Sequence, residues 1–151
     1  WRIQAQILHI GNYRVMWINC YLPTDPQTIE YNDAELSIVL AEIESILDSC
    51  SFDDCVLGGD LNFDKRRNSG FVAAVSEFLD KIGMLSVWDK FPLDFTHMHT
   101  DAKSTSILDH FYVNQRLLES ITGPVHLGDN RSRHSPIMMK VEIGRMPARV
   151  Q

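Results

Sequence analysis

The chain has 151 residues, of which 44% are hydrophobic and 23% are charged, a composition that supports one folded domain and excludes a disordered or low-complexity chain. The formal net charge of −6 gives no general attraction to phosphate backbones, so contact with nucleic acid would depend on local basic groups. No apolar run approaches the roughly 18 residues that span a bilayer, so we expect no membrane association.

Two strands are predicted at residues 2–9 and 13–22, on either side of Gly11-Asn12. Because polar and apolar side chains alternate in the second run, the two should form an antiparallel hairpin. Trp1 stands inside the first strand rather than in a polar lead, which suggests that the sequence is a fragment.

A helix follows, with Asn32 and Glu35 resembling a capping box. Apolar residues recur at helical spacing from Leu36 to Leu47, while the other face is acidic. A buried strand is predicted at residues 55–58. A second helix is predicted at about 70–82.

Ser69 is a candidate N-cap of this second helix and Gly83 suits its end. Short β-like pieces come later, at residues 85–88, 94–98, 106–113 and 136–143. Strands interrupted by two helices predict an α/β (α+β) fold, with helices packed on a sheet. We expect a partial domain at residues 1–143 and a linker or tail at 144–151.

Three cysteines, Cys20, Cys50 and Cys55, have no C-x-x-C spacing, which argues against a zinc site and a complete disulfide framework. Each is expected to be a small buried hydrophobe. Free thiols fit a reducing, intracellular location.

Asp60 and Asn62 directly follow the buried strand and the pair Gly58-Gly59. If strand geometry persists, both polar side chains leave on one face, at the carboxyl end of a strand, where α/β proteins build sites. The glycines indicate an unusual backbone conformation or a close approach. The alternative is a simple turn, because all these residue types favour turns.

Asp109 lies within the apolar run 106–113, and burying a carboxylate is costly unless it is paired. His134 precedes the last apolar strand, and pairing with Asp109 would orient its imidazole and favour the charged form. Alone, His134 would be a surface histidine in a polar loop. Together with Asp60 and Asn62, the order fits a phosphodiesterase site built from acids and a histidine.

Four segments carry a family resemblance: Asn19-Cys20-Tyr21-Leu22-Pro23, Gly59-Asp60-Leu61-Asn62, Ser106-Ile107-Leu108-Asp109-His110 and His134-Ser135-Pro136. With these, the chain resembles the endonuclease/exonuclease/phosphatase superfamily of metal-dependent phosphodiesterases over nearly all of residues 1–143. Phe95-Thr96-His97 makes it most similar to endonuclease domains of non-LTR retrotransposons.

The resemblance implies a four-layer β-sandwich, with two packed, mostly antiparallel sheets flanked by helices. The chain would supply roughly the second half and would need the missing N-terminal half as a partner. An inner sheet face left uncovered would make the chain prone to association.

The resemblance also implies roles for individual residues. Asp60 would orient or deprotonate the attacking water, Asn62 would hold a phosphate oxygen, and His134 paired with Asp109 would stabilise transition-state charge. Tyr21 would reach a phosphate oxygen, or else fill a strand face. The cofactor would be Mg²⁺ or Mn²⁺, with Asp60 and Asn62 among its ligands.

Two departures from the family pattern bear on activity. The family's main metal ligand, a glutamate in a Gln-Glu motif, has no counterpart in the sequence, nor does an earlier strand-end asparagine. Arg133 stands where the family's Ser-Asp-His motif has aspartate. It would repel a cation and lower the pKa of His134, or it would grip a phosphate directly.

The expected function is therefore a DNA endonuclease of retrotransposon origin, intracellular and, given that origin, nuclear. One alternative is a truncated or decayed pseudoenzyme that acts as a binding domain. Another is a phospholipid or inositol phosphate phosphatase. Any DNA site preference would depend on loops such as 98–105 and 126–133.

Overall fold

A computed structural model describes residues 2–24, 34–100, 103–126 and 132–142. Its main sheet has five strands, in the spatial order β1 (Ile3–Ile10), β2 (Tyr13–Cys20), β3 (Asp54–Asp60), β7 (Asp109–Val113) and β4 (Leu85–Ser86). β2 and β3 are parallel, and the other neighbours are antiparallel. The predicted amino-terminal hairpin is confirmed, with register pairs from Ile3 and Cys20 to Ile10 and Tyr13.

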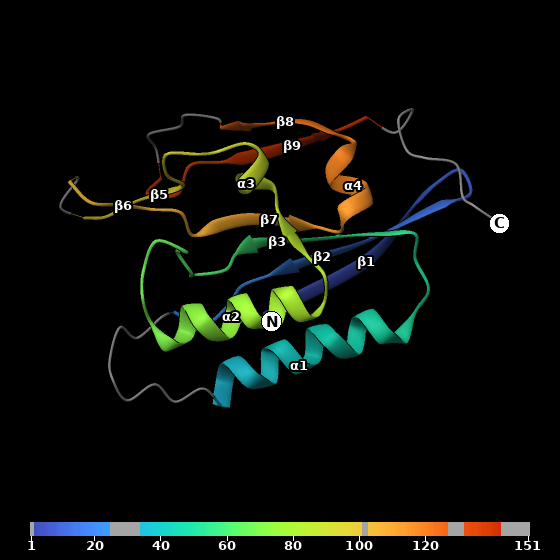
Figure 1. Cartoon of the computed structure of the whole chain (residues 1–151), viewed down its shortest axis with the longest axis horizontal. Helices are drawn as coiled ribbons and strands as arrows, with labels where there is room; N and C mark the ends of the chain where they lie inside the picture. Colours follow the sequence, from blue (N-terminus) through green and yellow to red (C-terminus); the bar gives the residue numbers. More distant parts are fainter. Residues whose placement is uncertain (1, 25–33, 101–102, 127–131, 143–151) are drawn as a thin grey trace.

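Two helices, α1 (Ala34–Ser49) and α2 (Gly70–Lys81), cover one face of this sheet (Figure 1). Each lays an apolar stripe on the core; the buried residues are Leu36, Val39 and Ile43 in α1 and Phe71, Val72, Val75, Phe78 and Leu79 in α2. Ser69 is the N-cap of α2, as predicted, because its side chain accepts a hydrogen bond from the N–H of Val72. The predicted cap Asn32 lies outside the described residues.

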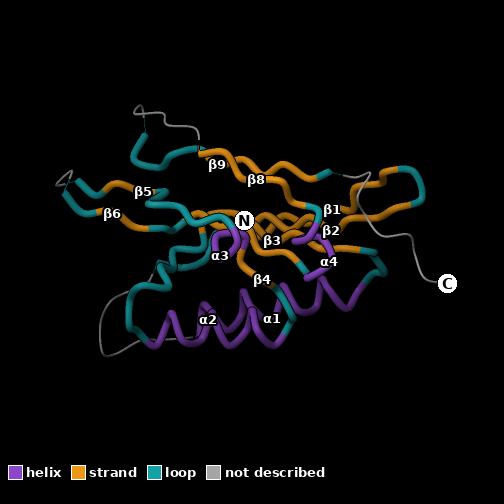
Figure 2. The backbone as a smooth tube through the Cα atoms, turned by 45° about the horizontal axis from the view of Figure 1, so that its top comes forward, coloured by secondary structure: helices purple, strands orange, loops and turns teal. Residues whose placement is uncertain are grey.

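The opposite face is covered by a hairpin of β8 (Ile121–His126) and β9 (Ile137–Val141) and by two short helices, α3 (Val87–Lys90) and α4 (Gln115–Glu119) (Figure 2). A second apolar cluster fills this side; its buried members are Val15, Val56, Val87, Trp88, Val113, Leu117 and Ile121. The described chain therefore confirms a mixed α/β fold with helices on a sheet. The complete four-layer sandwich stays a prediction.

A third, small sheet pairs β5 (His97–Met98) with β6 (Thr105–Ser106) at one end of the molecule. The predicted strand at 85–88 is wrong beyond Ser86, because the Ser86 hydroxyl caps the N–H of Trp88 and starts α3. The run 106–113 is interrupted at 107–108.

α4 and β8 were not predicted from the sequence, and the proposed tail at 144–151 lies outside the described residues. Among the helices of the described residues, none is long and apolar enough to cross a membrane.

Candidate active site

Three of the predicted site residues converge at one end of the main sheet. Asp60 ends β3, Asp109 opens β7, and the two are register partners in this antiparallel pair. His134 enters from the segment before β9 and lies over both acids. Side-chain ligand atoms of all three residues lie within 4.8 Å of one another. Two carboxylates placed opposite each other repel, so this arrangement calls for a cation or a charged imidazole.

The predicted Asp109–His134 pair is present in the structure. His134 Nδ1 lies 2.9 Å from Asp109 Oδ2, and His134 Nε2 lies 3.9 Å from Asp60 Oδ2. The carboxylate fixes both the ring orientation and the protonated nitrogen, so Nε2 faces Asp60. Asp109 occupies the first position of its strand rather than the middle of a continuous one, which leaves room for His134 at the strand end.

Asp60 has an altered acidity because of where β3 ends. Burial raises the pKa of Asp60 above the ordinary value of an aspartate, and the nearby charge of Asp109 raises it further. The hydrogen bond from the Asn62 N–H and the charge of His134 lower the pKa, but they do not cancel the effect of burial. A carboxylate with a raised pKa is a better proton acceptor near neutral pH. Asp60 is therefore suited to take a proton from water.

Asn62 does not continue the strand. Its φ of 50° lies in the left-handed region, which asparagine tolerates better than most residues. Its backbone N–H donates to Asp60 Oδ1 at 3.0 Å and its side-chain Nδ2 donates to the Leu22 carbonyl at 2.9 Å. The prediction of continued strand geometry is thus wrong, but the turn anchors the amide beside Asp60. Its role as a metal or phosphate ligand stays a prediction.

Gly59 explains the double glycine before Asp60. Its φ is 129°, and a Cβ at this position would lie 2.1 Å from the Cys20 carbonyl oxygen. Both predicted reasons for glycine, an unusual conformation and a close approach, therefore apply. Only a residue without a side chain lets β2 come so near the strand that carries Asp60.

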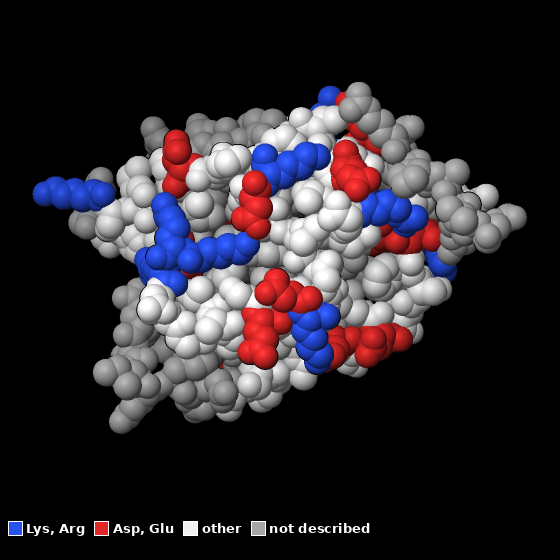
Figure 3. All heavy atoms as spheres, in the orientation of Figure 1, with Lys and Arg blue, Asp and Glu red and all other residues white. Residues whose placement is uncertain are grey.

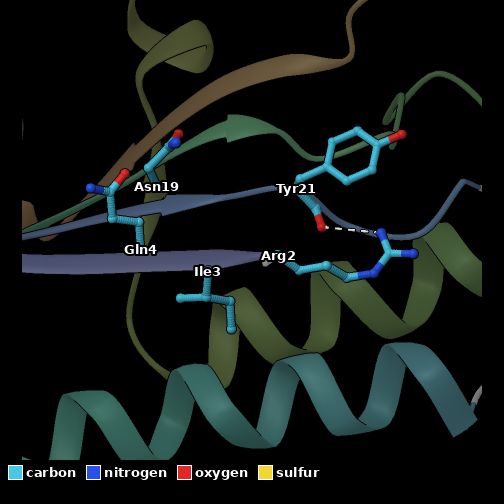
Figure 4. Close-up of a pocket in the computed structure, with 5 residues that line it drawn as sticks. All are labelled: Arg2, Ile3, Gln4, Asn19 and Tyr21. Atoms are coloured by element: carbon cyan, nitrogen blue, oxygen red, sulfur yellow. Dashed lines mark hydrogen bonds between the residues drawn. The ribbon is translucent and has the colours of Figure 1, made fainter.

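Tyr21 lies just beyond β2, where its backbone N–H donates to the Arg2 carbonyl at 2.8 Å. Figure 4 shows Asn19 and Gln4 on one side of the hairpin, while Ile3 points to the helices. Together with Arg2 and Tyr21 they line an open pocket. Tyr21 is 48% exposed, so it fills no core position. This exposure favours the predicted contact with substrate, which stays a prediction.

Thr96 holds the site together, a role that the sequence did not reveal, although residues 95–97 carried part of the family resemblance. The side chain is fully buried, and its hydroxyl accepts hydrogen bonds from the N–H groups of Leu108 and Asp109, both at 2.9 Å. Its carbonyl accepts from the N–H of Ser135 at 2.8 Å. One threonine therefore ties the start of β7 to the segment of His134. No spacing rule marks such a residue in the sequence.

Next to Thr96, His97 packs against His134 with ring centroids 4.7 Å apart. Burial lowers the pKa of His97, and the charges of His134, His99 and Arg133 act in the same direction. Arg133 itself is exposed, and its carbonyl accepts from the Met98 N–H at 2.9 Å. Its predicted effect on the pKa of His134 stays a prediction.

The donor atoms of the cluster fit a divalent cation. Asp60 and Asp109 offer carboxylate oxygens and His134 an imidazole nitrogen. Cations such as Mg²⁺ and Mn²⁺ prefer oxygen ligands, which the two carboxylates supply. A possible metal site is therefore present in the described residues.

The described chain is similar in fold to solved structures of endonuclease/exonuclease/phosphatase proteins, which it matches over part of their length. The endonuclease domain of TRAS1, a telomere-specific non-LTR retrotransposon, matches 95% of this chain over 63% of its own, with a TM-score of 0.74 and 13% identity. A family protein from Leptotrichia buccalis matches 93% of this chain over 53% of its own, with a TM-score of 0.66 and 19% identity.

The 3′ phosphatase NExo from Neisseria, solved with a product DNA hairpin, matches 93% of this chain over 65% of its own, with a TM-score of 0.69 and 16% identity. No protein-family model and no curated protein matches the sequence. At such low identities the structures establish the fold. The chain spans only 53% to 65% of their lengths.

Proposed function

We propose that this chain is part of a divalent-metal-dependent phosphodiesterase, a DNA endonuclease of retrotransposon origin that hydrolyses a phosphodiester by attack of an activated water. The observation that supports this best is the convergence of Asp60, Asp109 and His134 within 4.8 Å. The similarity to the TRAS1 endonuclease fold supports the narrower assignment.

In this proposal each side chain acts from the position described above. Asp60, with its raised pKa, orients the water and takes its proton. His134, fixed at Nδ1 by Asp109, uses Nε2 to stabilise charge on a phosphate oxygen. Asn62 donates one side-chain amide hydrogen to the Leu22 carbonyl, and its second amide hydrogen is available to the phosphate. The exposed Tyr21 hydroxyl contacts another oxygen.

We propose that Asp60 and Asn62 would hold a Mg²⁺ or Mn²⁺ ion, while Asp109 and His134, whose ligand atoms lie within 4.8 Å of that of Asp60, would stay paired with each other beside it. The ion supplies positive charge that neutralises the phosphate and the leaving oxygen. The two carboxylate oxygens of Asp60 have different neighbours. Oδ1 accepts a hydrogen bond from the Asn62 N–H, and Oδ2 lies nearer His134.

Plasmid nicking with Mg²⁺ tests this function. We expect little or no nicking by this chain alone; any nicking should be abolished by chelation and lowered about 100-fold by Asp60→Ala, because the proton acceptor is lost. Arg133→Asp should raise the rate, since it returns a carboxylate beside His134. Lys81→Ala, which removes an exposed partner of Glu44 far from the cluster, is the control and should change nothing. Nicking that survives Asp60→Ala would contradict the proposal.

A second candidate is a binding domain without catalysis. It is favoured by Arg133, an exposed residue that directly precedes His134 in the chain, because an arginine there suits a bound phosphate better than a metal. A chain that binds DNA in an anisotropy titration, loses binding on Arg133→Ala and never nicks plasmid would support this candidate.

We also propose that a further polypeptide segment, corresponding to the unmatched part of the similar structures, completes the domain. Leu8 and Ile10 are 37% and 36% exposed on one face of β1, and the matched structures contain a part with no counterpart here. The corresponding part would cover this exposed face of β1, which also carries Gln4 and Gln6, and would contribute the metal-binding glutamate. Adding that part should raise nicking by the same Asp60-dependent route.

A further inference from the structure

A row of side chains leads from His134 away from the cluster. The ring of His97 lies 4.7 Å from that of His134 and 4.8 Å from that of His99, measured between centroids. His99 Nε2 then lies 2.8 Å from Ser106 Oγ. At the end of the row Arg67 donates from its terminal NH2 nitrogen to the same hydroxyl at 2.8 Å.

Arg67 is held in place by buried structure. Ser106 is fully buried, and the arginine also lies 3.4 Å from His99 Nε2. Anchoring one nitrogen on a buried hydroxyl fixes the orientation of the planar guanidinium before any ligand arrives. A guanidinium fixed in this way loses less freedom on binding an anion than a free one.

The charge of Arg67 is not neutralised in the way its neighbours' charges are. Lys65 pairs with Asp89 and Arg66 with Asp64, whereas Arg67 has no carboxylate partner within the described ranges. Figure 3, which has the orientation of Figure 1, shows Lys and Arg side chains gathered on the left of the view, where the loop after β3 lies in Figure 1. Although the chain is acidic overall, Arg67 therefore provides a positive charge in a fixed position at the end of the row of histidines.

We propose that Arg67 and His99 form a subsite for a second phosphate of a nucleic-acid strand, next to the phosphate that reacts at Asp60 and His134. This inference rests on the proposed function and narrows the substrate to a nucleic-acid strand with at least two successive phosphodiesters. Guanidinium groups bind phosphate through paired hydrogen bonds. Arg67 lies at the far end of a row of three imidazoles that begins at His134, so it would contact a phosphate other than the one that reacts at the cluster.

Binding of short thymidine oligomers tests the subsite, with Ca²⁺ in place of Mg²⁺ to prevent cleavage. The probes are the dinucleotide, which has one phosphodiester, and the trinucleotide, which has two. We expect the trinucleotide to bind the native chain about tenfold more tightly. Arg67→Gln should abolish this ratio without changing affinity for the dinucleotide. Lys65→Gln, two residues away and already paired with Asp89, should preserve it.

An unchanged ratio in Arg67→Gln would overturn the subsite, as would failure of the native chain to bind the trinucleotide. Equal binding of inositol bisphosphate would also overturn it, because the site would then accept any pair of phosphates. Asp60-dependent plasmid nicking is measured separately. If nicking holds and the ratio does not depend on Arg67, the subsite fails and the proposed function stands.

Discussion

His110 is a buried imidazole directly beside Asp109, and it faces away from the site. It is 2% exposed, and its Nε2 donates to the carbonyls of Phe63 at 2.8 Å and Ile107 at 3.1 Å. Burial lowers the pKa of His110 to about 4, against the two carbonyls, which raise it. The ring is therefore neutral at neutral pH and ties the loop after β3 to the start of β7.

This residue makes stability depend on pH. The unfolded chain binds a proton on His110 near pH 6.5, whereas the folded chain does not until about pH 4, so stability is lost as the pH falls between these values. Lowering the pH from 7 to 5 should remove about 2 kcal/mol of unfolding free energy through this group. Urea unfolding with a chelator present measures it. His110→Gln should lose less stability over this range than the native chain; an equal loss would contradict the assignment.

At the scale of elements, a buried carboxylate joins β3 to α4 at the end of the sheet away from the site. The Asp54 side chain is fully buried; its Oδ1 accepts from Asn114 Nδ2 at 2.6 Å and from Arg116 Nε at 3.0 Å. Asn114 Oδ1 in turn accepts from the Cys55 N–H at 3.0 Å. This network fixes where β3 begins, and so where Asp60 lies at its far end.

Removing the arginine should show the value of this network. Arg116→Ala leaves the buried Asp54 carboxylate with Asn114 as its one remaining side-chain partner among the described residues, which should cost about 3 kcal/mol of unfolding free energy. Lys81→Ala, which breaks an exposed pair with Glu44, should cost less than about 1 kcal/mol. Urea titrations at neutral pH compare the two variants. Equal midpoints would show that the buried pair does not hold α4 to the sheet.

At the scale of the whole molecule, the three free thiols report on the core between the sheet and the long helices. Cys20 on β2 and Cys55 on β3 are buried in that core, whereas Cys50 is only half-buried at its edge. Burial raises the pKa of Cys20 and of Cys55 to about 12. Neither forms much thiolate at pH 8 while the chain stays folded.

Thiol labelling should therefore separate local from global opening. In native buffer at pH 8 we expect Cys50 to react rapidly with an aromatic disulfide reagent and the other two to react at the rate of global unfolding. Cys50→Ala should remove the fast phase alone. Fast labelling of Cys20 would show that β2 opens without the rest of the sheet.

Much of this architecture could be predicted from patterns that are local in the chain. The amino-terminal hairpin and the two long helices follow from alternation and from apolar spacing, because one buried face imposes period 2 on a strand and period 3.6 on a helix. The short helix α3 did not follow, because capping of Trp88 by the Ser86 hydroxyl decides it over only a few residues. Local patterns also gave no sign of β8.

The sequence by itself determined which chemistry is available: Asp60 and Asn62 after two glycines, an acid at Asp109 and a histidine at His134. Only the tertiary structure decided that three of these meet, because Asp60 and Asp109 become neighbours through the pairing of β3 with β7. Thr96 and Arg67 emerged in the same way. Their partners lie 12 to 39 positions away along the chain, and no local pattern encodes contacts that folding creates.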